Sequence, residues 1–200
     1  MPSPTLDAAL AQTYDAKTLA EKVQNKVALQ EELGWPAEPK RAMICLPAGM
    51  SDVLGGTLLK EVLPGLLTLP VELVILGKGG AAYGSYFTEL AKEHPHRIAI
   101  IPNKPEWIAK MLAASDMALF LADPDAQSEV ETCLSYGTLP VSLPGKSVKD
   151  YNPNQETGNA FVFEKATQWH CFGALVRALE THRFPFDWRT IQRHAMEESQ

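Results

Sequence analysis

Short, uninterrupted apolar runs alternate with amphipathic stretches along most of this chain, and this alternation limits its possible folds more than any other feature. The runs are four to six residues long and rich in Ile, Val, Leu and Ala: 42–46, 71–76, 97–101, 117–121, 139–142 and 160–163. The stretches between them predict helices over 54–67, 82–93, 106–113 and 128–136, and two more from about 166 and about 187. Runs that are apolar on both faces predict a parallel sheet covered by helices.

The chain has the size and composition of one ordinary soluble domain. Its 200 residues are 46% hydrophobic and 21% charged, which supplies a core without metals or disulfides. Its three cysteines stand far apart, as expected for reduced, buried thiols rather than a disulfide framework or a zinc site. The predicted fold class is therefore α/β, a Rossmann-like doubly wound parallel sheet.

Charge and segment patterns argue against several kinds of partner. Twenty-four acidic and eighteen basic side chains give a net charge of −6, whereas a nucleic-acid binder usually carries a basic surplus. No apolar stretch is long enough to span a membrane, and the N-terminus lacks the features of a secretion signal. The five histidines show no metal-ligand spacing and are expected at the surface. We therefore expect a cytoplasmic protein that binds neither nucleic acid nor membrane and holds no metal.

The chain divides near its start. Residues 1–13 carry no clear period and are expected to be disordered or a linker, whereas 14–200 are expected to form the single domain. A helix is expected from Thr18, because Thr18 and Glu21 have the spacing of a capping box and apolar residues then recur every four positions. The residues of that apolar stripe are Leu19, Val23 and Val27. Gly34 and the prolines after it end the helix.

Ligands of an open α/β sheet bind beyond the carboxyl ends of its strands, so the loops after the apolar runs are the places to look for a site. The run at 71–76 is followed by Gly77, Lys78, Gly79 and Gly80 and then by a helix. Glycines there would let backbone amides approach an anionic ligand, and Lys78 would add positive charge. The alternative is a tight strand-to-helix turn that needs glycine. The spacing matches neither a P-loop nor a dinucleotide fingerprint.

Two further loops carry polar candidates. Gly145 and Lys146 would hold a phosphate near a helix start, or would form an exposed turn. Asp123 and Asp125, with Glu129 behind them, would serve acid–base or cation chemistry as paired carboxylates. The same residues at the start of a helix would stabilise its first turn, and this capping interpretation is favoured.

The order of the motifs resembles one family. In chain order these motifs are Tyr14-Asp15-Ala16, Lys22, Asn25-Lys26, Leu29-Gln30, Leu63-Pro64-Gly65, Leu76-Gly77-Lys78-Gly79, Ala114-Ser115-Asp116, Tyr136-Gly137-Thr138-Leu139-Pro140-Val141, Thr157-Gly158, Trp188, Gln192 and Ala195-Met196. They resemble the second domain of bacterial glycogen synthases and plant starch synthases. This resemblance implies one half of a GT-B glycosyltransferase, the nucleotide-sugar-binding half of an enzyme that moves glucose from ADP-glucose to an α-1,4-glucan without a metal.

The departures from the family pattern bear on activity. The family loop after the first strand carries an Arg and a Lys that stabilise the diphosphate leaving group, and here Gly49 and Leu54 stand in their places. Asp125 is the nearest acidic residue to the sugar-contacting Glu of the family, and Lys146 interrupts its phosphate turn. The resemblance therefore implies no catalytic residue in this chain. It implies a residual nucleotide-sugar site at Gly77, Lys78, Gly79, Asp125, Gly145 and Lys146.

The family also carries an N-terminal domain that completes the active-site cleft, so a fragment or a free-standing relative is expected. The favoured interpretation is a domain that is inactive alone and is kept for binding or assembly in α-glucan metabolism, with an α-glucan or a synthase as partner. The second is an active half whose N-terminal domain is supplied separately, with Lys78 and Lys146 replacing the lost cations. The third is an unrelated small Rossmann protein that binds a nucleotide. ADP or ADP-glucose is the expected small ligand, and no cofactor is expected.

Overall fold

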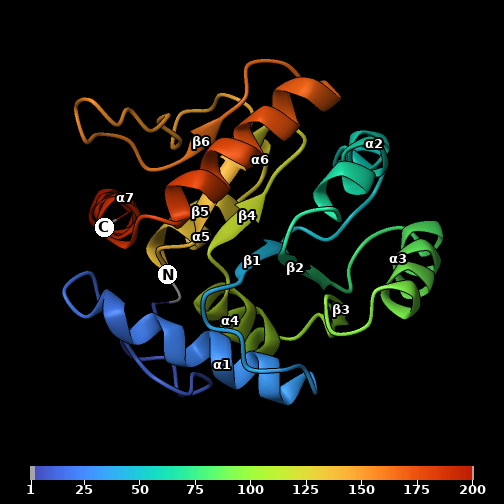
Figure 1. Ribbon diagram of the computed structural model, residues 1–200, viewed down its shortest axis with the longest axis horizontal. Helices are drawn as coiled ribbons and strands as arrows, with labels where there is room; N and C mark the ends of the chain where they lie inside the picture. The colour runs from blue at the N-terminus through green and yellow to red at the C-terminus, as the bar shows by residue number, and fades with distance from the viewer. Residues whose placement is uncertain (1–2, 200) are drawn as a thin grey trace.

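The computed structural model describes residues 3–199 and contains a six-stranded sheet (Figure 1). In chain order the strands are β1 (Ala42–Leu46), β2 (Val71–Leu76), β3 (Ile98–Ile101), β4 (Met117–Leu119), β5 (Leu139–Ser142) and β6 (Phe161–Val162). All neighbours are parallel, in the spatial order β3-β2-β1-β4-β5-β6. The predicted fold class, a Rossmann-like doubly wound parallel sheet, is confirmed.

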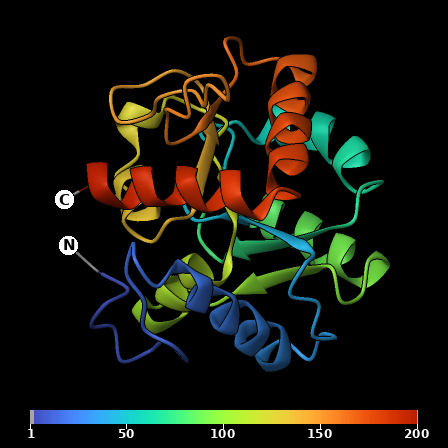
Figure 2. The ribbon, with the colours of Figure 1, turned by 60° about the vertical axis from the view of Figure 1, so that its left-hand side comes forward.

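Helices connect these strands and cover both faces of the sheet (Figures 1 and 2). The α-helices are α1 (Lys22–Glu32), α2 (Gly56–Leu66), α3 (Ala81–Glu93), α4 (Pro105–Ala114), α5 (Glu129–Ser135), α6 (Gln168–His182) and α7 (Pro185–Glu198), with 3-10 turns η1 (Leu19–Glu21) and η2 (Pro124–Ala126). α1 packs along α4, α2 beside α6, and α7 against α5. No helix within residues 3–199 is long and apolar enough to cross a membrane.

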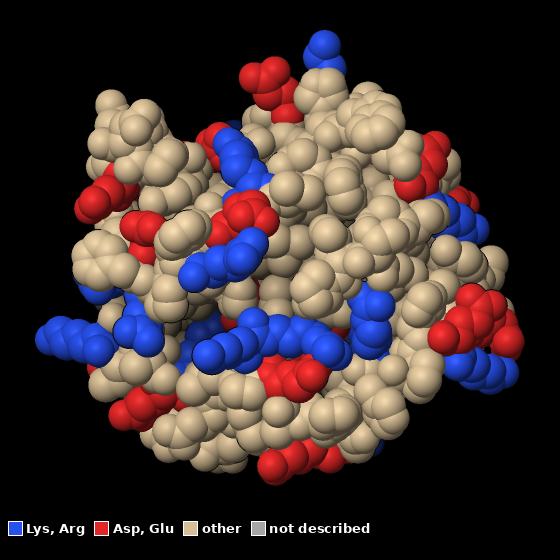
Figure 3. Space-filling model, in the orientation of Figure 1, with Lys and Arg blue, Asp and Glu red and all other residues tan. Residues whose placement is uncertain are grey.

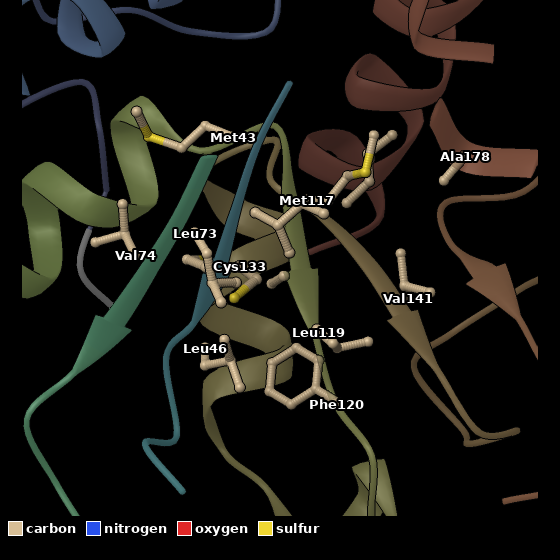
Figure 4. Packing of buried hydrophobic residues seen from close by; sticks show 14 of the residues in the cluster. Met43, Leu46, Leu73, Val74, Met117, Leu119, Phe120, Cys133, Val141 and Ala178 are labelled. Carbon is tan, nitrogen blue, oxygen red and sulfur yellow. The ribbon is translucent and has the colours of Figure 1, made fainter. Parts of the chain in front are cut away.

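The core lies on both sides of the central strands. β1 and β2 are buried along their whole length, which is what their uninterrupted apolar sequences require. Figure 4 shows apolar side chains of this core, among them Leu46, Leu73, Leu119 and Phe120, around the central strands. The three cysteines are free and buried, as predicted, and burial raises the pKa of the Cys45 thiol to about 12.

Residues 3–13 lie against the domain and make specific contacts with it. The Tyr136 hydroxyl donates a hydrogen bond to Asp7 Oδ2 at 3.0 Å. The backbone of Gln12 exchanges two hydrogen bonds with the amide side chain of Asn25, at 3.1 and 2.7 Å. Of the segment predicted to be disordered or a linker, residues 1 and 2 lie outside the described part. The domain boundary at residue 14 stays a prediction.

The buried face of α1 differs from the face that the sequence predicts. Val23, in the predicted apolar stripe, is 41% exposed, and Val27 is only half-buried. The buried residues of the helix are Lys22, Asn25, Lys26, Leu29 and Gln30. The helix therefore turns a largely polar face inward. The spacing of the apolar residues predicts the wrong face, because the contacts of the buried polar side chains decide which face is buried.

The helix start also differs from the prediction. The Thr18 side chain does not cap the following turn; its hydroxyl accepts a hydrogen bond from Asp15 N at 2.9 Å. The Asp15 carboxylate accepts from the amides of Lys17 and Thr18, at 2.8 and 2.9 Å. These hydrogen bonds hold the pKa of Asp15 below its usual value. The reciprocal cap therefore lies three residues earlier than predicted and does not use Glu21.

The buried ammonium of Lys22 ties α1 to the end of α4. It donates to the carbonyl oxygens of Leu112 and Ala113, at 2.9 and 2.8 Å. These carbonyls belong to the last turn of α4, where they have no partner within their own helix and where the helix dipole favours a cation. Lys22 is thus a structural cap for a neighbouring helix.

Lys26 and Asp116 form a buried ion pair just before β4. Lys26 Nζ lies 2.5 Å from Asp116 Oδ2, and His182 Nε2 lies 3.3 Å from Asp116 Oδ1. Burial alone would raise the pKa of Asp116, but the charges of Lys26 and His182 outweigh it and hold that pKa well below its usual range. The expected surface position of His182 is wrong, because the side chain is 15% exposed and faces this carboxylate.

The buried carboxyl of Glu72 should make the stability of the fold depend on pH. Gln30 Nε2 donates to both of its carboxylate oxygens, at 3.0 and 2.8 Å, but burial raises the pKa of Glu72 from 4.5 to about 7. A carboxyl with a raised folded-state pKa stabilises the fold at low pH, and that advantage is lost as the pH rises from the unfolded pKa to the folded one. We expect Glu72→Gln to match the wild type at pH 5 in urea denaturation and to exceed it by up to about 3 kcal/mol at pH 8.

The exposed Glu89→Gln substitution is the control for this experiment, because the Glu89 side chain is 69% exposed and forms an exposed pair with Lys92. We expect this control to change stability by less than about 1 kcal/mol at both pH values. A Glu72→Gln effect of the same size at pH 5 and pH 8 would contradict the raised pKa.

Candidate functional site

All residues of the predicted site lie at the carboxyl edge of the sheet, in the loops after β2, β4 and β5. β1 and β4 are neighbours in the sheet, but the strand that follows β1 lies on one side of this pair and the strand that follows β4 lies on the other. The carboxyl edge between β1 and β4 is therefore the topological switch point, where doubly wound sheets bind ligands. Contacts bring the predicted residues together in two groups. The turn at 77–80 meets the loop after β1, and Asp125 meets Gly145 and Lys146.

The turn at 77–80 pairs with the backbone of the loop after β1. Met50 N donates to Lys78 O at 3.0 Å, and Gly80 N donates to Met50 O at 3.2 Å. A Cβ on Gly49 would collide with Lys78 O, and a Cβ on Gly79 would collide with Met50 O. Both glycines have positive φ, +72° and +124°. The close approach of two backbones therefore accounts for these glycines without a ligand.

Most amides of this turn already have acceptors. Three of the four donate to backbone carbonyls: Gly77 N to Ile101 O at 2.8 Å, Lys78 N to Leu76 O at 2.7 Å, and Gly80 N to Met50 O. The Gly79 amide has no acceptor among residues 3–199. A hollow of about 210 Å³ lies over the turn and is also lined by Tyr83 and Phe87. It is smaller than the usual small-molecule site of roughly 300 Å³ or more.

The Lys78 ammonium reaches across to the start of α5. It lies 3.3 Å from Glu129 Oε1, and the Lys78 side chain is 51% exposed. A half-exposed ion pair of this kind contributes about 0–1 kcal/mol, so Lys78 can leave it for a stronger anion. Glu129, a capping or acid candidate from its place in the sequence, is thus the partner of Lys78, which its local pattern does not indicate.

Asp125 holds the turn that contains Gly145 and Lys146. Its Oδ1 accepts a hydrogen bond from Lys146 N at 2.7 Å. A Cβ on Gly145 would lie 2.9 Å from the same oxygen, so glycine permits this contact. Asp123 Oδ1 accepts from Asp125 N at 3.0 Å, which confirms the capping interpretation for Asp123. The Lys146 ammonium is exposed and makes no ion pair within the described residues.

The loop after β1 is closed over by aromatic and apolar contacts. The Tyr83 hydroxyl donates to Asp52 Oδ1 at 2.5 Å, and this hydrogen bond to a carboxylate raises the pKa of Tyr83. Leu54 is half-buried and packs on the core. Gly55 has a φ of +85°, and a Cβ there would lie 2.6 Å from Leu121 Cβ. Neither Gly49 nor Leu54 offers a cation at this edge.

The carboxyl edge therefore offers little for chemistry and somewhat more for binding an anion. Within residues 3–199 its unengaged donors include the Lys146 ammonium and the Gly79 amide, with Lys78 in a weak pair. Among residues 3–199 there is no group of three or more His, Cys, Asp and Glu side chains that could hold a metal ion. The Asp125 carboxylate is engaged by backbone rather than free for acid–base work.

A polar cluster that the sequence pattern does not predict lies at the opposite, amino edge of the sheet. Lys22, Asn25, Lys26 and Gln30 recur at helical spacing on one face of α1, and all are buried. Four long polar side chains on one helix face ordinarily indicate a solvent-exposed side. Partners from other elements, such as Asp116, are needed to identify that face as buried.

The fold defines the class to which this domain belongs. The catalytic domain of starch synthase IV from Arabidopsis thaliana, bound to ADP and acarbose, matches with a TM-score of 0.86 and 22% identity. The match covers 97% of this chain and 42% of that one. The domain thus has the fold of one Rossmann-like half of a GT-B glycosyltransferase. A scan against protein-family models finds no match.

Sequence relatives identify the family within that class. The glycogen synthase of Cellvibrio japonicus is 32% identical over 97% of this chain, and that of Streptococcus equi subsp. equi is 31% identical over 97%. The chain corresponds to the C-terminal GT-B half of a glycogen or starch synthase, as the resemblance predicted. It spans 42% of the length of these relatives. Because the chain is related to glycogen synthases, the interpretation as an unrelated nucleotide-binding protein is wrong.

Proposed function

We propose that this domain, a synthase-like glycosyltransferase domain, transfers no glucose by itself and acts in the cytoplasm through binding or assembly in α-glucan metabolism. The observation that carries the proposal is the backbone at Gly49, the position of the leaving-group Arg in the family resemblance. Its positive φ and its contact with Lys78 O leave no room for a side chain. The loop has a shape that excludes the Arg.

The neighbouring positions support the same proposal. Leu54 replaces the second cation and packs on the core instead of facing a ligand. Removing one preorganised donor to a transition state costs about a hundred- to a thousand-fold in rate, so losing both leaves negligible transfer. Asp125, the nearest acidic residue to the sugar-contacting Glu, accepts a backbone hydrogen bond from Lys146.

A second candidate function is an active half whose N-terminal domain is supplied by another chain. The observation that favours it is the presence of cations that can reach an anion at the carboxyl edge. The Lys146 ammonium is exposed without an ion pair in the described part of the chain, and Lys78 is held only by its half-exposed contact with Glu129. In this candidate Lys78 and Lys146 would stabilise the diphosphate leaving group.

The two candidates predict different rates of ADP release. With ADP-glucose and a maltooligosaccharide primer, we expect no release above background from the domain, alone or mixed with the N-terminal domain of a bacterial glycogen synthase. Turnover in the mixture that falls about a hundred-fold in Lys78→Gln or Lys146→Gln, but not in Lys92→Gln, would establish the second candidate instead. Lys92 is the matched control because it lies in the last turn of α3, in an exposed pair with Glu89.

Calorimetric titration with ADP and ADP-glucose, without metal, tests whether nucleotide binding survives. The starch synthase IV structure holds ADP, which makes ADP the first ligand to try. Under the main proposal we expect no binding that is lost in Lys78→Gln at about 1 mM ligand, because a dissociation constant above that value is too weak for a working donor site. Retardation in native gels that contain amylopectin, or co-purification with a synthase, would then distinguish a glucan from a protein partner.

A further inference from the structure

A larger hollow lies at the amino edge of the sheet, away from the candidate nucleotide-sugar site. Its volume is about 530 Å³, within the range of sites for small molecules. The buried Lys26–Asp116 pair and His182 line it. Asp116 immediately precedes β4, whereas Gly77 and Lys78 immediately follow β2, so the two hollows lie at opposite ends of parallel strands.

Positive charge is concentrated around this hollow. Its lining contains five Lys and Arg side chains and one acid: Lys22, Lys26, Lys40, Arg183, Arg189 and Asp116. Figure 3 shows Lys and Arg side chains gathered in a band along α1 on this face. The chain as a whole has a net charge of −6, so this concentration is local. A pocket lined by one sign of charge raises the local concentration of the opposite ion.

Contacts within the domain account for only part of this charge. Lys22 caps α4, and Lys26 is paired with Asp116. Lys40 and Arg189 are exposed and make no ion pair among residues 3–199. Arg183 has only an exposed contact with Glu180 at 3.5 Å. The ordering of a long cationic side chain costs conformational entropy. Because Lys40, Arg183 and Arg189 are exposed, contacts within the fold do not explain why all three face one hollow.

Arg189 lies near the start of α7 (Pro185–Glu198). It is the fifth residue of the helix, just past the first turn, and that turn also carries the acidic Asp187. Phe184, at the N-cap position, offers no side-chain acceptor to the first amides of α7. A bound anion would be favourable to these amides.

Much of the remaining wall of the hollow is apolar. Leu19, Val23 and Trp188 contribute to it. The Trp188 ring stacks on Phe161 at a centroid distance of 5.8 Å and meets the edge of His182 at 5.0 Å. Its indole Nε1 is buried and has no hydrogen-bond partner within the described residues. The site thus combines cations on its rim with a fixed apolar and aromatic wall.

We propose that this hollow is a binding site for a small organic phosphate, whose phosphate group contacts Lys40, Arg183 and Arg189. The organic part lies against Val23 and Trp188. Guanidinium groups match phosphate oxygens in geometry and charge, which favours a phosphate over a monocarboxylate. The limited volume of the hollow and the acidic net charge of the chain favour a small ligand over a nucleic acid.

Calorimetric titration with inorganic pyrophosphate and with orthophosphate, at low salt, tests the phosphate part of the site. We expect saturable binding that weakens as NaCl is added. Lys40→Gln and Arg189→Gln should each weaken it about ten-fold, the size of one charge-assisted hydrogen bond. The matched control is Arg193→Gln, an exposed cation on the same helix outside the lining, which should change affinity by less than about two-fold.

A second variant distinguishes binding inside the hollow from unspecific attraction to the cations of the surface. Val23 is 41% exposed, so Val23→Trp should leave the fold intact while filling the hollow, and we expect it to abolish binding without removing a cation. No saturable binding of either probe at about 10 mM would overturn the proposal. Equal losses in Arg189→Gln and Arg193→Gln would also overturn it, because they would indicate unspecific attraction.

This inference is independent of the proposed function, and ADP distinguishes the two sites because it carries a diphosphate. ADP binding that is lost in Arg189→Gln and kept in Lys78→Gln would belong to the amino-edge hollow and would support the inference. The reverse pattern would assign ADP to the carboxyl edge and would favour the second candidate function.

Discussion

Gly49→Arg, which restores the family residue, is expected to lower the free energy of unfolding by about 3 kcal/mol or more rather than to restore activity. A side chain at a φ of +72° is strained, and its Cβ would collide with Lys78 O. Relief of that collision requires breaking the pairing of Met50 with Lys78 and Gly80. Urea denaturation followed by circular dichroism measures the loss.

Gly173→Arg is the matched control, because it introduces the same side chain at a glycine of α6 with open space around it. We expect this control to leave stability unchanged or to raise it by up to about 1 kcal/mol, since glycine is a poor helix former. A Gly49→Arg protein as stable as the wild type, or one that gains ADP release from ADP-glucose, would contradict the argument from the loop shape.

Asp116→Asn is expected to lower the free energy of unfolding by about 3–5 kcal/mol at pH 7. The substitution keeps the size of the side chain and leaves Lys26 charged in a buried position without its counter-ion. Asp116 Oδ2 also accepts a hydrogen bond from Met43 N at 2.8 Å, at the start of β1. Because this one carboxylate joins α1, β1 and α6, its loss should weaken all three together.

The pH dependence identifies the charge as the cause. The folded-state pKa of Asp116 lies below its ordinary value of 3.8, so its stabilising effect is present above that value and is lost as the pH falls through the folded pKa. The difference between wild type and Asp116→Asn should therefore shrink below about pH 4. Glu89→Gln, which removes an exposed pair with Lys92, should cost less than about 1 kcal/mol. A similar small cost for Asp116→Asn would disprove the buried pair.

Much of the fold could be predicted because strand and helix signals are local. β1, β2 and β5 occupy the predicted ranges, since buried parallel strands need apolar residues at consecutive positions and leave little ambiguity. The other predicted strand and helix ends lie within two residues of the observed ones, except the start of the first helix, which was expected at Thr18 whereas α1 begins at Lys22 after the turn η1. The order of the motifs was enough to predict the family, because it constrains the whole chain at once.

The candidate site was predictable in place but not in detail. Topology puts Gly77, Lys78, Asp125 and Gly145 at the carboxyl edge, as the general rule for doubly wound sheets requires. Which amides and carboxylates remain free depends on the loop from another strand that approaches them. That information lies in the contact of Met50 with Gly79, between residues distant in sequence.

The sequence by itself determined the α/β class, the strands and the family, because each depends on patterns repeated along the chain. Only the tertiary structure decided that α1 buries its polar face, since Lys22 and Lys26 are tolerable inside only beside acceptors from α4 and Asp116. Only the tertiary structure decided that the glycine turn serves backbone packing against Met50. Side chains and amides acquire partners when distant segments meet, and a local pattern contains no record of that meeting.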